Sequence, residues 1–311
     1  INNLSPYEVR FTENRQFFTE GTEIFNKAGL FYSRRVGAIP SGYSSVKYFV
    51  AGNTDWEIVK NPSVTQLYNA TKFSGRTKKK LGIGIFNAVT APMEAKLHNR
   101  ITGKDSIVRT EPLSNYNIIV LDQALKGRSY VTFTNTNVLR NGNERDANVT
   151  AVDIALYDKT NTHAFRGTAR YSKIWGTNGY DGYNTTLVYG KVSGNWQYDL
   201  SGNIESKNYD PNDLGILYAP NEVTYRANIA YRIFNPTKNF ITYSYSISPR
   251  LQYLYKPYAY SNLDITGVAF WVFKNFWDIT LSSQVVPGHQ HNYFELRTEG
   301  KYLDYPSNYI F

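Results

Sequence analysis

Between Gln66 and Tyr302, apolar and polar residues alternate in segments of about ten residues separated by turn-rich connections. The clearest segment runs from Asn195 to Ser206, where Leu200 and Ile204 fall on one face and Asp199 falls on the other. A period of two predicts β-strands with one apolar and one polar face. Strands in soluble sandwiches usually have about five or six residues, so a length of about ten favours strands that cross a membrane.

The connections between these segments alternate between short and long. Gly75 to Lys80 and Ser193-Gly194 are short, whereas Ala91 to Asn115 and Lys207 to Asn221 are long. Bacterial transmembrane barrels have short periplasmic turns and long external loops. The alternation therefore predicts an all-β fold, a transmembrane antiparallel β-barrel of about 14 to 16 or more strands.

Both ends of the sequence predict an incomplete chain. The opening residues do not form a signal peptide, so an outer-membrane protein would be represented here by a mature or internal fragment. Asp304 to Asn308 resembles a short periplasmic turn, and Tyr309 to Phe311 resembles the start of another outward strand. The alternative is that Phe311 is the terminal aromatic residue of a closing strand, although Pro306 fits such a strand poorly.

Residues 1–65 show no clean alternation and form a separate unit in our interpretation. Leu30 to Gly37 or Tyr43 to Val50 supplies a possible first strand, and Thr22 to Lys27 a short helix that stops at Gly29. We therefore divide the chain into an N-terminal, plug-like segment (1–65) and the barrel strands and loops (66–311).

The stretch from Glu13 to Gly37 is too polar to meet lipid and too apolar to remain a free linker, so it needs a protein surface to cover it. We expect it inside or across the periplasmic mouth of the barrel, as a plug or gate or as a linker that seals the mouth. Gly82 and Gly84 would face the lumen where this stretch packs closely. The plug-like residues are Phe17, Phe18, Phe25, Arg34 and Arg35.

The polar faces of the predicted strands carry charges that should point into the lumen. A shift of one residue in register would place them all in hydrocarbon, so the register is strongly specified. The lumen-facing charged residues predicted in this way are Asp153, Arg166, Arg170, Asp199, Glu205, Arg226, Arg232, Asp264, Asp278, Glu295, Arg297 and Glu299.

Composition is compatible with a barrel. The chain is 41% hydrophobic with a mean hydropathy of −0.46, and it lacks the run of about 18 apolar residues that a membrane helix needs. A barrel keeps a polar inner face, so its average hydropathy stays low. The 27 Tyr, 17 Phe and 5 Trp could form aromatic girdles at the two membrane interfaces, although aromatic residues also simply favour strands.

Charge and cysteine content narrow the function classes. The net charge of +9 would suit nucleic acid, anionic lipid or an anion-selective lumen. Basic clusters with interleaved aromatic residues are missing, so we expect no nucleic-acid partner. The chain has no cysteine, which excludes disulfides, thiolate metal sites and a cysteine nucleophile, and its four histidines give little support for metal chemistry. We expect no cofactor and no metal.

Six blocks of the sequence are characteristic: Glu13 to Gly21, Ile24-Phe25, Phe31 to Gly37, Lys72 to Gly75, Gly82 to Thr90 and Tyr209 to Gly215. In these blocks the chain resembles a large Gram-negative outer-membrane β-barrel family of unassigned function. Members of that family carry an N-terminal β-sandwich similar to family-nine carbohydrate-binding modules, and no catalytic residues are established for it. The resemblance implies an outer-membrane location.

The function we expect is that of an integral outer-membrane barrel that acts in transport or as a membrane subunit of a larger complex. Its partners would be outer-membrane lipid and other outer-membrane or periplasmic proteins. One alternative is a barrel that houses a Ser-His-Asp hydrolase, suggested by His163 near Arg166 and Asp153. A second alternative is a soluble all-β glycan-binding protein. No catalytic residue is singled out.

Two further clusters have chemical and structural interpretations. Asp210, Asn212 and Asp213 offer oxygen ligands to a hard cation, but they also suit an Asx turn that organises a long loop. His289 and His291 have the spacing of two ligands on one strand face, but without an evident third ligand they suit a solvated loop.

Overall fold

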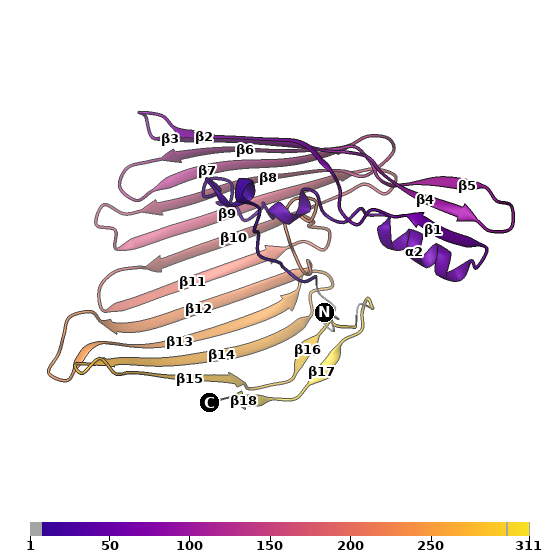
Figure 1. The fold of residues 1–311 in the computed structure, drawn as a ribbon. Helices are drawn as coiled ribbons and strands as arrows, with labels where there is room; N and C mark the ends of the chain where they lie inside the picture. The colour runs from indigo at the N-terminus through magenta and orange to yellow at the C-terminus, as the bar shows by residue number, and fades with distance from the viewer. Residues whose placement is uncertain (1–7, 297, 311) are drawn as a thin grey trace.

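Antiparallel strand pairing organises the computed structural model, which describes residues 8–296 and 298–310. Thirteen strands form one sheet, and each pairs with its neighbours along the chain apart from two insertions (Figure 1). The all-β prediction is confirmed. In sheet order the strands are β2 (Leu67–Arg76), β3 (Leu81–Thr90), β6 (Ser114–Ala124), β7 (Tyr130–Arg140), β8 (Asp146–Tyr157), β9 (His163–Trp175), β10 (Tyr180–Lys191), β11 (Trp196–Glu205), β12 (Glu222–Ile233), β13 (Phe240–Leu254), β14 (Tyr260–Phe273), β15 (Asp278–Val286) and β18 (Asn308–Ile310).

The sheet is curved across its strands. In Figure 1, β2, β3 and β6 are seen almost edge-on, whereas β9 to β14 are seen face-on. Within the described residues the sheet has two open edges, at β2 and β18, and no closed barrel is found. None of the helices in those residues is long and apolar enough to cross a membrane.

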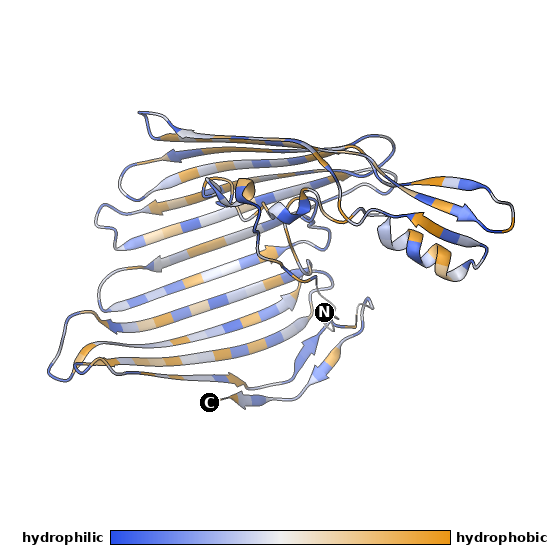
Figure 2. Cartoon of the chain, viewed as in Figure 1, coloured by the Kyte–Doolittle hydropathy of each residue, from blue (hydrophilic) through white to orange (hydrophobic). Residues whose placement is uncertain are grey.

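Strand register gives this sheet two distinct faces. We call the face that carries Phe86 and Asp122 the inner face, because the N-terminal part of the chain packs on it, and the opposite face, which carries Leu200 and Ile247, the outer face. Directly paired residues share a face, so the continuous register from β3 to β15 extends both faces across the sheet. Figure 2 shows the resulting alternation of polar and apolar residues along the strands.

The inner face has two halves. From β3 to β8 it is buried and largely apolar, with Phe86, Ile118, Val120 and Val149 in the hydrophobic clusters. The exceptions include the buried threonines of β7: Thr132, Thr134 and Thr136. From β9 to β15 it is polar. The polar half includes Arg166, Arg170, Asn184, Thr186, Asp199, Asn203, Glu205, Glu222, Thr224, Arg226, Asn228, Arg232, Asp264, Asp278 and Thr280.

A small unit projects beyond the end of the large sheet, on the side of the long connections (Figure 1). It consists of helix α2 (Tyr43–Gly52) and a sheet of β1 (Trp56–Lys60), β4 (Met93–Asn99) and β5 (Asp105–Glu111). The strand considered at Tyr43 to Val50 is therefore wrong. The residues are helical because Val46 and Val50, spaced by four, both pack on the cluster that contains Ala95 and Leu97.

The C-terminal part also differs from expectation. In the described residues from Phe294 to Tyr302 no strand forms, although the alternation predicts one. They lie between the two strands of a short hairpin, β16 (Gln290–Asn292) and β17 (Leu303–Tyr305). The side chain of Asn292 accepts hydrogen bonds from the backbone N–H groups of Phe294 and Glu295, at 3.0 and 3.1 Å, and this local turn displaces the strand. Asp304 to Asn308 is consequently not a turn at the short-connection end, and β18 runs antiparallel to β15.

Candidate functional site

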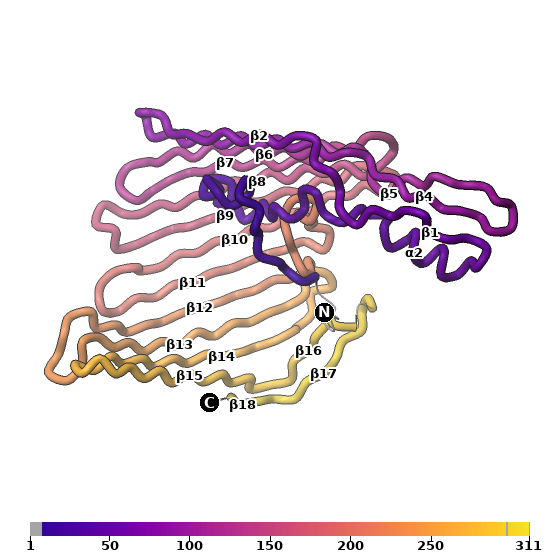
Figure 3. Tube along the Cα trace, viewed as in Figure 1, coloured from indigo at the N-terminus to yellow at the C-terminus, as the bar shows by residue number. Residues whose placement is uncertain are grey.

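The N-terminal segment, residues 8–37, packs on the apolar half of the inner face. It contains helix α1 (Gln16–Thr19) and the 3-10 turn η1 (Ser33–Arg35). Phe25 is completely buried, with its ring centroid 6.3 Å from that of Phe86, and the Phe31 ring lies 5.2 Å from the same ring. Figure 3 traces this segment in indigo in front of β7 to β10. The stretch is therefore not a free linker.

Two glycines of β3 make this packing possible. A Cβ on Gly84 would lie 3.0 Å from Ile24 and 3.1 Å from Phe25, and a Cβ on Gly82 would lie 3.3 Å from Ile24. Such separations are tighter than ordinary van der Waals contact. The glycines thus face the N-terminal segment, at the place where it comes closest to the sheet.

The helix expected at Thr22 to Lys27 is wrong, because the residues form a hydrogen-bonded turn. The backbone N–H of Phe25 and that of Asn26 both donate to the carbonyl of Thr22, at 3.0 and 3.1 Å. A helix of this length has too few hydrogen bonds to be stable by itself. Burial of Phe25 against the sheet fixes the turn instead, and Gly29 ends it with a positive φ of 65°.

Ionic contacts fasten the segment to the sheet. The ammonium of Lys27 lies 2.6 Å from Asp122, whose side chain is only 2% exposed. Asp122 also pairs with Arg76 at 2.7 Å and accepts a hydrogen bond from Thr132 at 2.8 Å. Lys72 of β2 donates to the backbone carbonyls of the segment at Phe17 and Glu20. Polar contacts therefore hold the segment at both sides of its apolar core.

A second set of contacts stiffens the segment internally. Glu13 accepts hydrogen bonds from Arg15 at 2.8 to 3.0 Å and from Ser33 at 2.7 Å. Burial alone would raise the pKa of Glu13, but the hydrogen bonds from Arg15 and Ser33 outweigh it and lower the pKa from 4.5 to about 2. Arg15 also donates to the carbonyls of Ser33 and Val36, so it joins both ends of the segment.

The connection between β11 and β12, residues 206–221, folds over the inner face and meets the N-terminal segment. Leu214 is buried in the same cluster as Phe25. The backbone N–H of Tyr32 donates to the carbonyl of Leu214 at 2.6 Å, and Arg35 donates to the carbonyl of Gly215 at 3.1 Å. We call the N-terminal segment and this connection together the interior block.

The connection crosses β10 at Gly182. Any Cβ there would overlap the backbone of Asn208 and Tyr209, so only glycine lets the chain pass this closely. Tyr209 is buried and packs with Ala28 and Leu30 of the N-terminal segment. A glycine in a strand thus marks a close crossing in β10 as it does in β3.

Arginine side chains hold the connection in this position. Arg145 lies 2.7 Å from Asp210 and 2.5 Å from Asp213, and Arg140 lies 2.8 Å from Asp213. Tyr180 donates to Asp210 at 2.7 Å. Burial alone would raise the pKa of Asp210, yet the hydrogen bonds from Arg145, the Asn212 backbone and Tyr180 hold it below its usual value.

Asp210 and Asp213 are therefore paired with arginine side chains. A metal cation would have to compete with these arginines for the two carboxylates. The backbone N–H of Asn212 donates to Asp210 at 3.0 Å, which is the Asx turn considered from the sequence. The Asn212 side chain in turn accepts from the N–H of Leu217 at 2.6 Å. In the described residues, no group of three or more His, Asp or Glu side chains could hold a metal ion.

The predicted lumen residues separate into three sets. Nine of them share the inner face, as the registers show: Asp153, Arg166, Arg170, Asp199, Glu205, Arg226, Arg232, Asp264 and Asp278. Glu295 and Glu299 lie in the turn between β16 and β17, where Glu295 accepts from Tyr305 and Glu299 pairs with Lys207. Arg297 lies outside the described residues.

The residues considered for a hydrolase do not come together. Asp153 pairs directly with Thr168, so it shares the inner face with the even-numbered residues of β9. His163 belongs to the odd-numbered residues on the outer face and contacts Tyr189 at 3.2 Å. His289 and His291 lie 2.9 and 3.8 Å from Asp304, and the His289 side chain is largely exposed to solvent.

Sequence reasoning identified the N-terminal part of the interior block and missed the rest. The aromatic and arginine residues named as plug-like all belong to the segment: Phe17, Phe18 and Phe25 pack around Phe86, and Arg35 reaches Gly215. Arg34 instead donates to the backbone carbonyl of Thr12. The inward fold of residues 206–221 was missed, because the segment that crosses Gly182 can be identified only in the folded structure.

Comparison with known proteins gives one match. A family profile described as a domain of unknown function (DUF5916) matches residues 1–311. The match confirms the expectation of a family without an assigned function. No curated protein and no solved structure matches the chain.

Proposed function

Because the chain belongs to the DUF5916 family of unknown function, we propose a role from its architecture: an integral outer-membrane β-barrel that acts in transport, with a lumen narrowed by the interior block. The open edges at β2 and β18 would be closed in the membrane. The same barrel would serve as a membrane subunit of a larger complex if the lumen does not conduct.

The observation that carries this proposal is the pairing of an exposed apolar face with a charged face. Leu200 is 60% exposed, Ile247 and Ile229 are each 51% exposed, and all three lie on the outer face. Soluble monomers rarely leave a contiguous apolar surface of more than a few hundred Å² uncovered. Hydrocarbon would cover this face, and the charged residues of the inner face would stay in water.

Aromatic contacts at both ends of the strands support a membrane location. Near the short connections, ring centroids lie 4.9 Å apart for Trp196 and Tyr231 and 4.9 Å apart for Phe240 and Phe273. Near the long connections, the Tyr253 and Tyr258 rings stack at 4.7 Å. Transmembrane barrels place aromatic girdles at both interfaces.

The polar half of the inner face supports transport over a purely structural role. The interior block packs on β3 to β8 and crosses β10 at Gly182, whereas Arg166, Arg226 and Arg232 of the wall from β9 to β15 remain exposed. A solute would pass between this wall and the interior block. Wall and block together would determine which solutes pass.

The proposed orientation places the short connections in the periplasm and the long ones outside. The hairpin of β16 and β17 lengthens the connection between β15 and β18, so that this connection also follows the alternation. The family resemblance adds a Gram-negative outer membrane and an upstream β-sandwich similar to family-nine carbohydrate-binding modules. Lipid would then be the first partner, with periplasmic or outer-membrane proteins beside it.

The test uses the full-length gene product. We expect it in the outer-membrane fraction, extractable only with detergent, and we expect its gel mobility to shift on boiling because closed barrels resist detergent unfolding. In planar bilayers, deletion of residues 8–30 should increase single-channel conductance.

A chain that stays soluble and monomeric without detergent would overturn the membrane assignment and favour the soluble glycan-binding alternative. A heat-modifiable barrel with the same near-zero conductance before and after the deletion would overturn transport and leave the role of a membrane subunit.

A further inference from the structure

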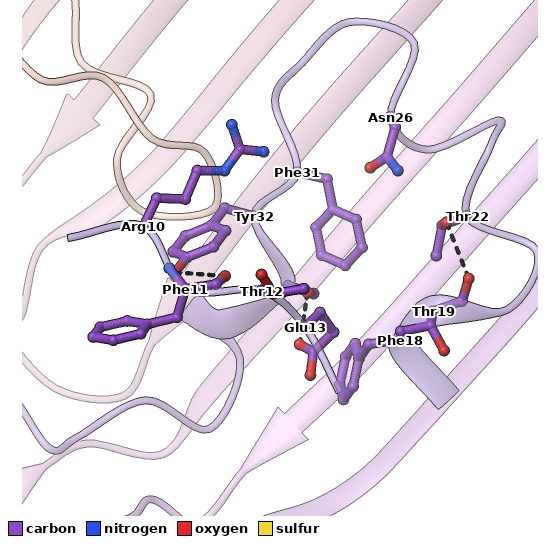
Figure 4. A pocket seen from close by; sticks show the side chains of 11 residues that line it. Arg10, Phe11, Thr12, Glu13, Phe18, Thr19, Thr22, Asn26, Phe31 and Tyr32 are labelled. Carbon is purple, nitrogen blue, oxygen red and sulfur yellow. Dashed lines mark hydrogen bonds between the residues drawn. The ribbon is translucent and has the colours of Figure 1, made fainter. Parts of the chain in front are cut away.

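A hollow of about 490 Å³ opens on the N-terminal segment, between its first residues and the turn that follows α1. Figure 4 shows it with the strands behind, the side chains of Phe18, Phe31 and Tyr32 around it and Phe11 at its rim. This volume falls within the range of small-ligand sites, about 300 to 1,000 Å³. Several of its lining residues, such as Glu13 and Phe31, make contacts described above, but those contacts do not fill the hollow.

The aromatic walls of the hollow are held in place before any ligand arrives. The Arg15 guanidinium lies 4.1 Å from the centroid of the Phe18 ring, and Phe31 packs on Phe86. Tyr32 is fixed because its hydroxyl accepts a hydrogen bond from the backbone N–H of Phe11 at 2.9 Å. The rings therefore present rigid apolar faces, so a ligand would lose little free energy in ordering them.

The polar groups around these rings are mostly neutral. The carboxylate of Glu13 is occupied by Arg15 and Ser33, and Arg10 lies over the Tyr32 ring at 5.8 Å. Thr22 donates its hydroxyl to the Thr19 carbonyl, which leaves its oxygen free to accept. Among the described residues, the Asn26 amide has no partner, and it can both donate and accept.

We propose that this hollow binds a neutral polyhydroxylated ring, a sugar of hexose size. One side of such a ring is apolar C–H surface that packs on an aromatic face, and its edge carries hydroxyls that both donate and accept. An amide and hydroxyls next to aromatic rings match that combination. The inference rests on the proposed transport function only in naming the sugar as the transported solute.

The test measures binding of D-glucose and maltose to the full-length protein by NMR titration. The protein is held in a detergent without a sugar headgroup, because a glucoside or maltoside would compete for the site. We expect saturable binding of both sugars, and about tenfold weaker binding after Asn26→Ala or Phe11→Ala, since each removes one contact with the ligand. Phe11 is 60% exposed, so its truncation leaves the fold intact.

Asn14→Ala is the matched control. Asn14 is an exposed asparagine of the same segment, and it does not line the hollow. Its dissociation constants should equal those of the unmodified protein. Equal effects of Asn14→Ala and Asn26→Ala would overturn the site, as would the lack of saturable binding of either sugar. Binding of D-glucuronate more than tenfold tighter than D-glucose would overturn the neutral class.

This outcome is separable from the test of transport. A heat-modifiable, conducting barrel that binds no sugar overturns the present inference and leaves the proposed function standing. Sugar binding that Asn26→Ala weakens, in a chain that remains soluble without detergent, overturns the proposed function and supports the site.

Discussion

Single residues decide where the interior block lies. Gly84 and Gly182 belong to different strands, and each allows a backbone or side chain to approach the inner face more closely than a Cβ would permit. The sequence indicated the first, because paired glycines inside a strand are unfavourable unless something packs there. It could not indicate the second, because the segment that crosses Gly182 is recognisable only once the chain has folded.

We predict that Gly84→Val loosens the N-terminal segment. The new side chain would collide with Ile24 and Phe25, so the segment should become accessible to limited proteolysis within residues 13–37. Gly202→Val is the matched control: Gly202 is also a strand glycine, but it lies on the outer face, where the nearest atom to an added Cβ is 4.0 Å away. Equal proteolysis of both variants would show that Gly84 does not position the segment.

Acid should release the same segment. Since the pKa of Glu13 falls from 4.5 to about 2 on folding, its stabilising effect is complete above pH 4.5 and is lost as the pH falls toward 2. Hydrogen exchange in residues 13–36 should therefore accelerate over that interval, after correction for the intrinsic rate. Glu13→Gln should remove most of this pH dependence, whereas Glu23→Gln, at an exposed position of the segment, should not. A pH dependence that persists in Glu13→Gln would contradict the assignment.

At the scale of elements, the β-strands were predictable and the insertions were not. A period-two pattern constrains a strand locally, which is why Asn195 to Ser206 was expected and Trp196–Glu205 is found. The stretch from Tyr43 to Val50 is rich in aromatic and β-branched residues, yet tertiary packing on Ala95 makes it helical. The inward fold of residues 206–221 depends on Arg145, a partner far away in the sequence.

We predict that Arg145→Gln releases the connection between β11 and β12. The variant loses the contacts to Asp210, Asp213 and Tyr180. Asp213 keeps Arg140, but Asp210 loses its charged partner, at a cost of about 1 to 3 kcal/mol. Hydrogen exchange in residues 207–217 should increase. Lys207→Gln removes only an exposed ion pair of the same connection and should change exchange little. Comparable increases in both variants would argue against a specific role for Arg145.

At the scale of the whole molecule, the register makes every strand from β7 to β14 two-faced. Ser246 and Ile247 are neighbours on β13, yet Ser246 pairs with Ala230 on the inner face and Ile247 with Ile229 on the outer face. The sequence predicted this separation because apolar and aromatic residues occupy one face of β11 to β14. It could not predict which part of the inner face the interior block covers and which part stays open, because polar and apolar residues alternate along the strands in both parts.

We predict that an arginine at position 247 destabilises the protein much more than an arginine at position 246. Ile247→Arg should destabilise the protein in lipid bilayers by about 2 to 4 kcal/mol, because the charge would lie near the middle of the hydrocarbon. Ser246→Arg should cost far less, since its side chain reaches the polar inner face. Urea unfolding of both variants in vesicles measures the difference. Equal destabilisation would mean that the outer face is not in contact with lipid.

The contacts of the N-terminal segment also set an order of assembly. Arg35 and Gly215, which share a hydrogen bond, are 180 residues apart in sequence, and Lys27 binds Asp122. Contacts of such high contact order form late, because the chain between them must first lose its freedom. The segment is therefore synthesised before its docking surface, and its contacts with Leu214 and Gly215 can form only after the connection between β11 and β12 has folded. Until then its phenylalanines are uncovered, and a chaperone that holds apolar peptides would find its first binding site there.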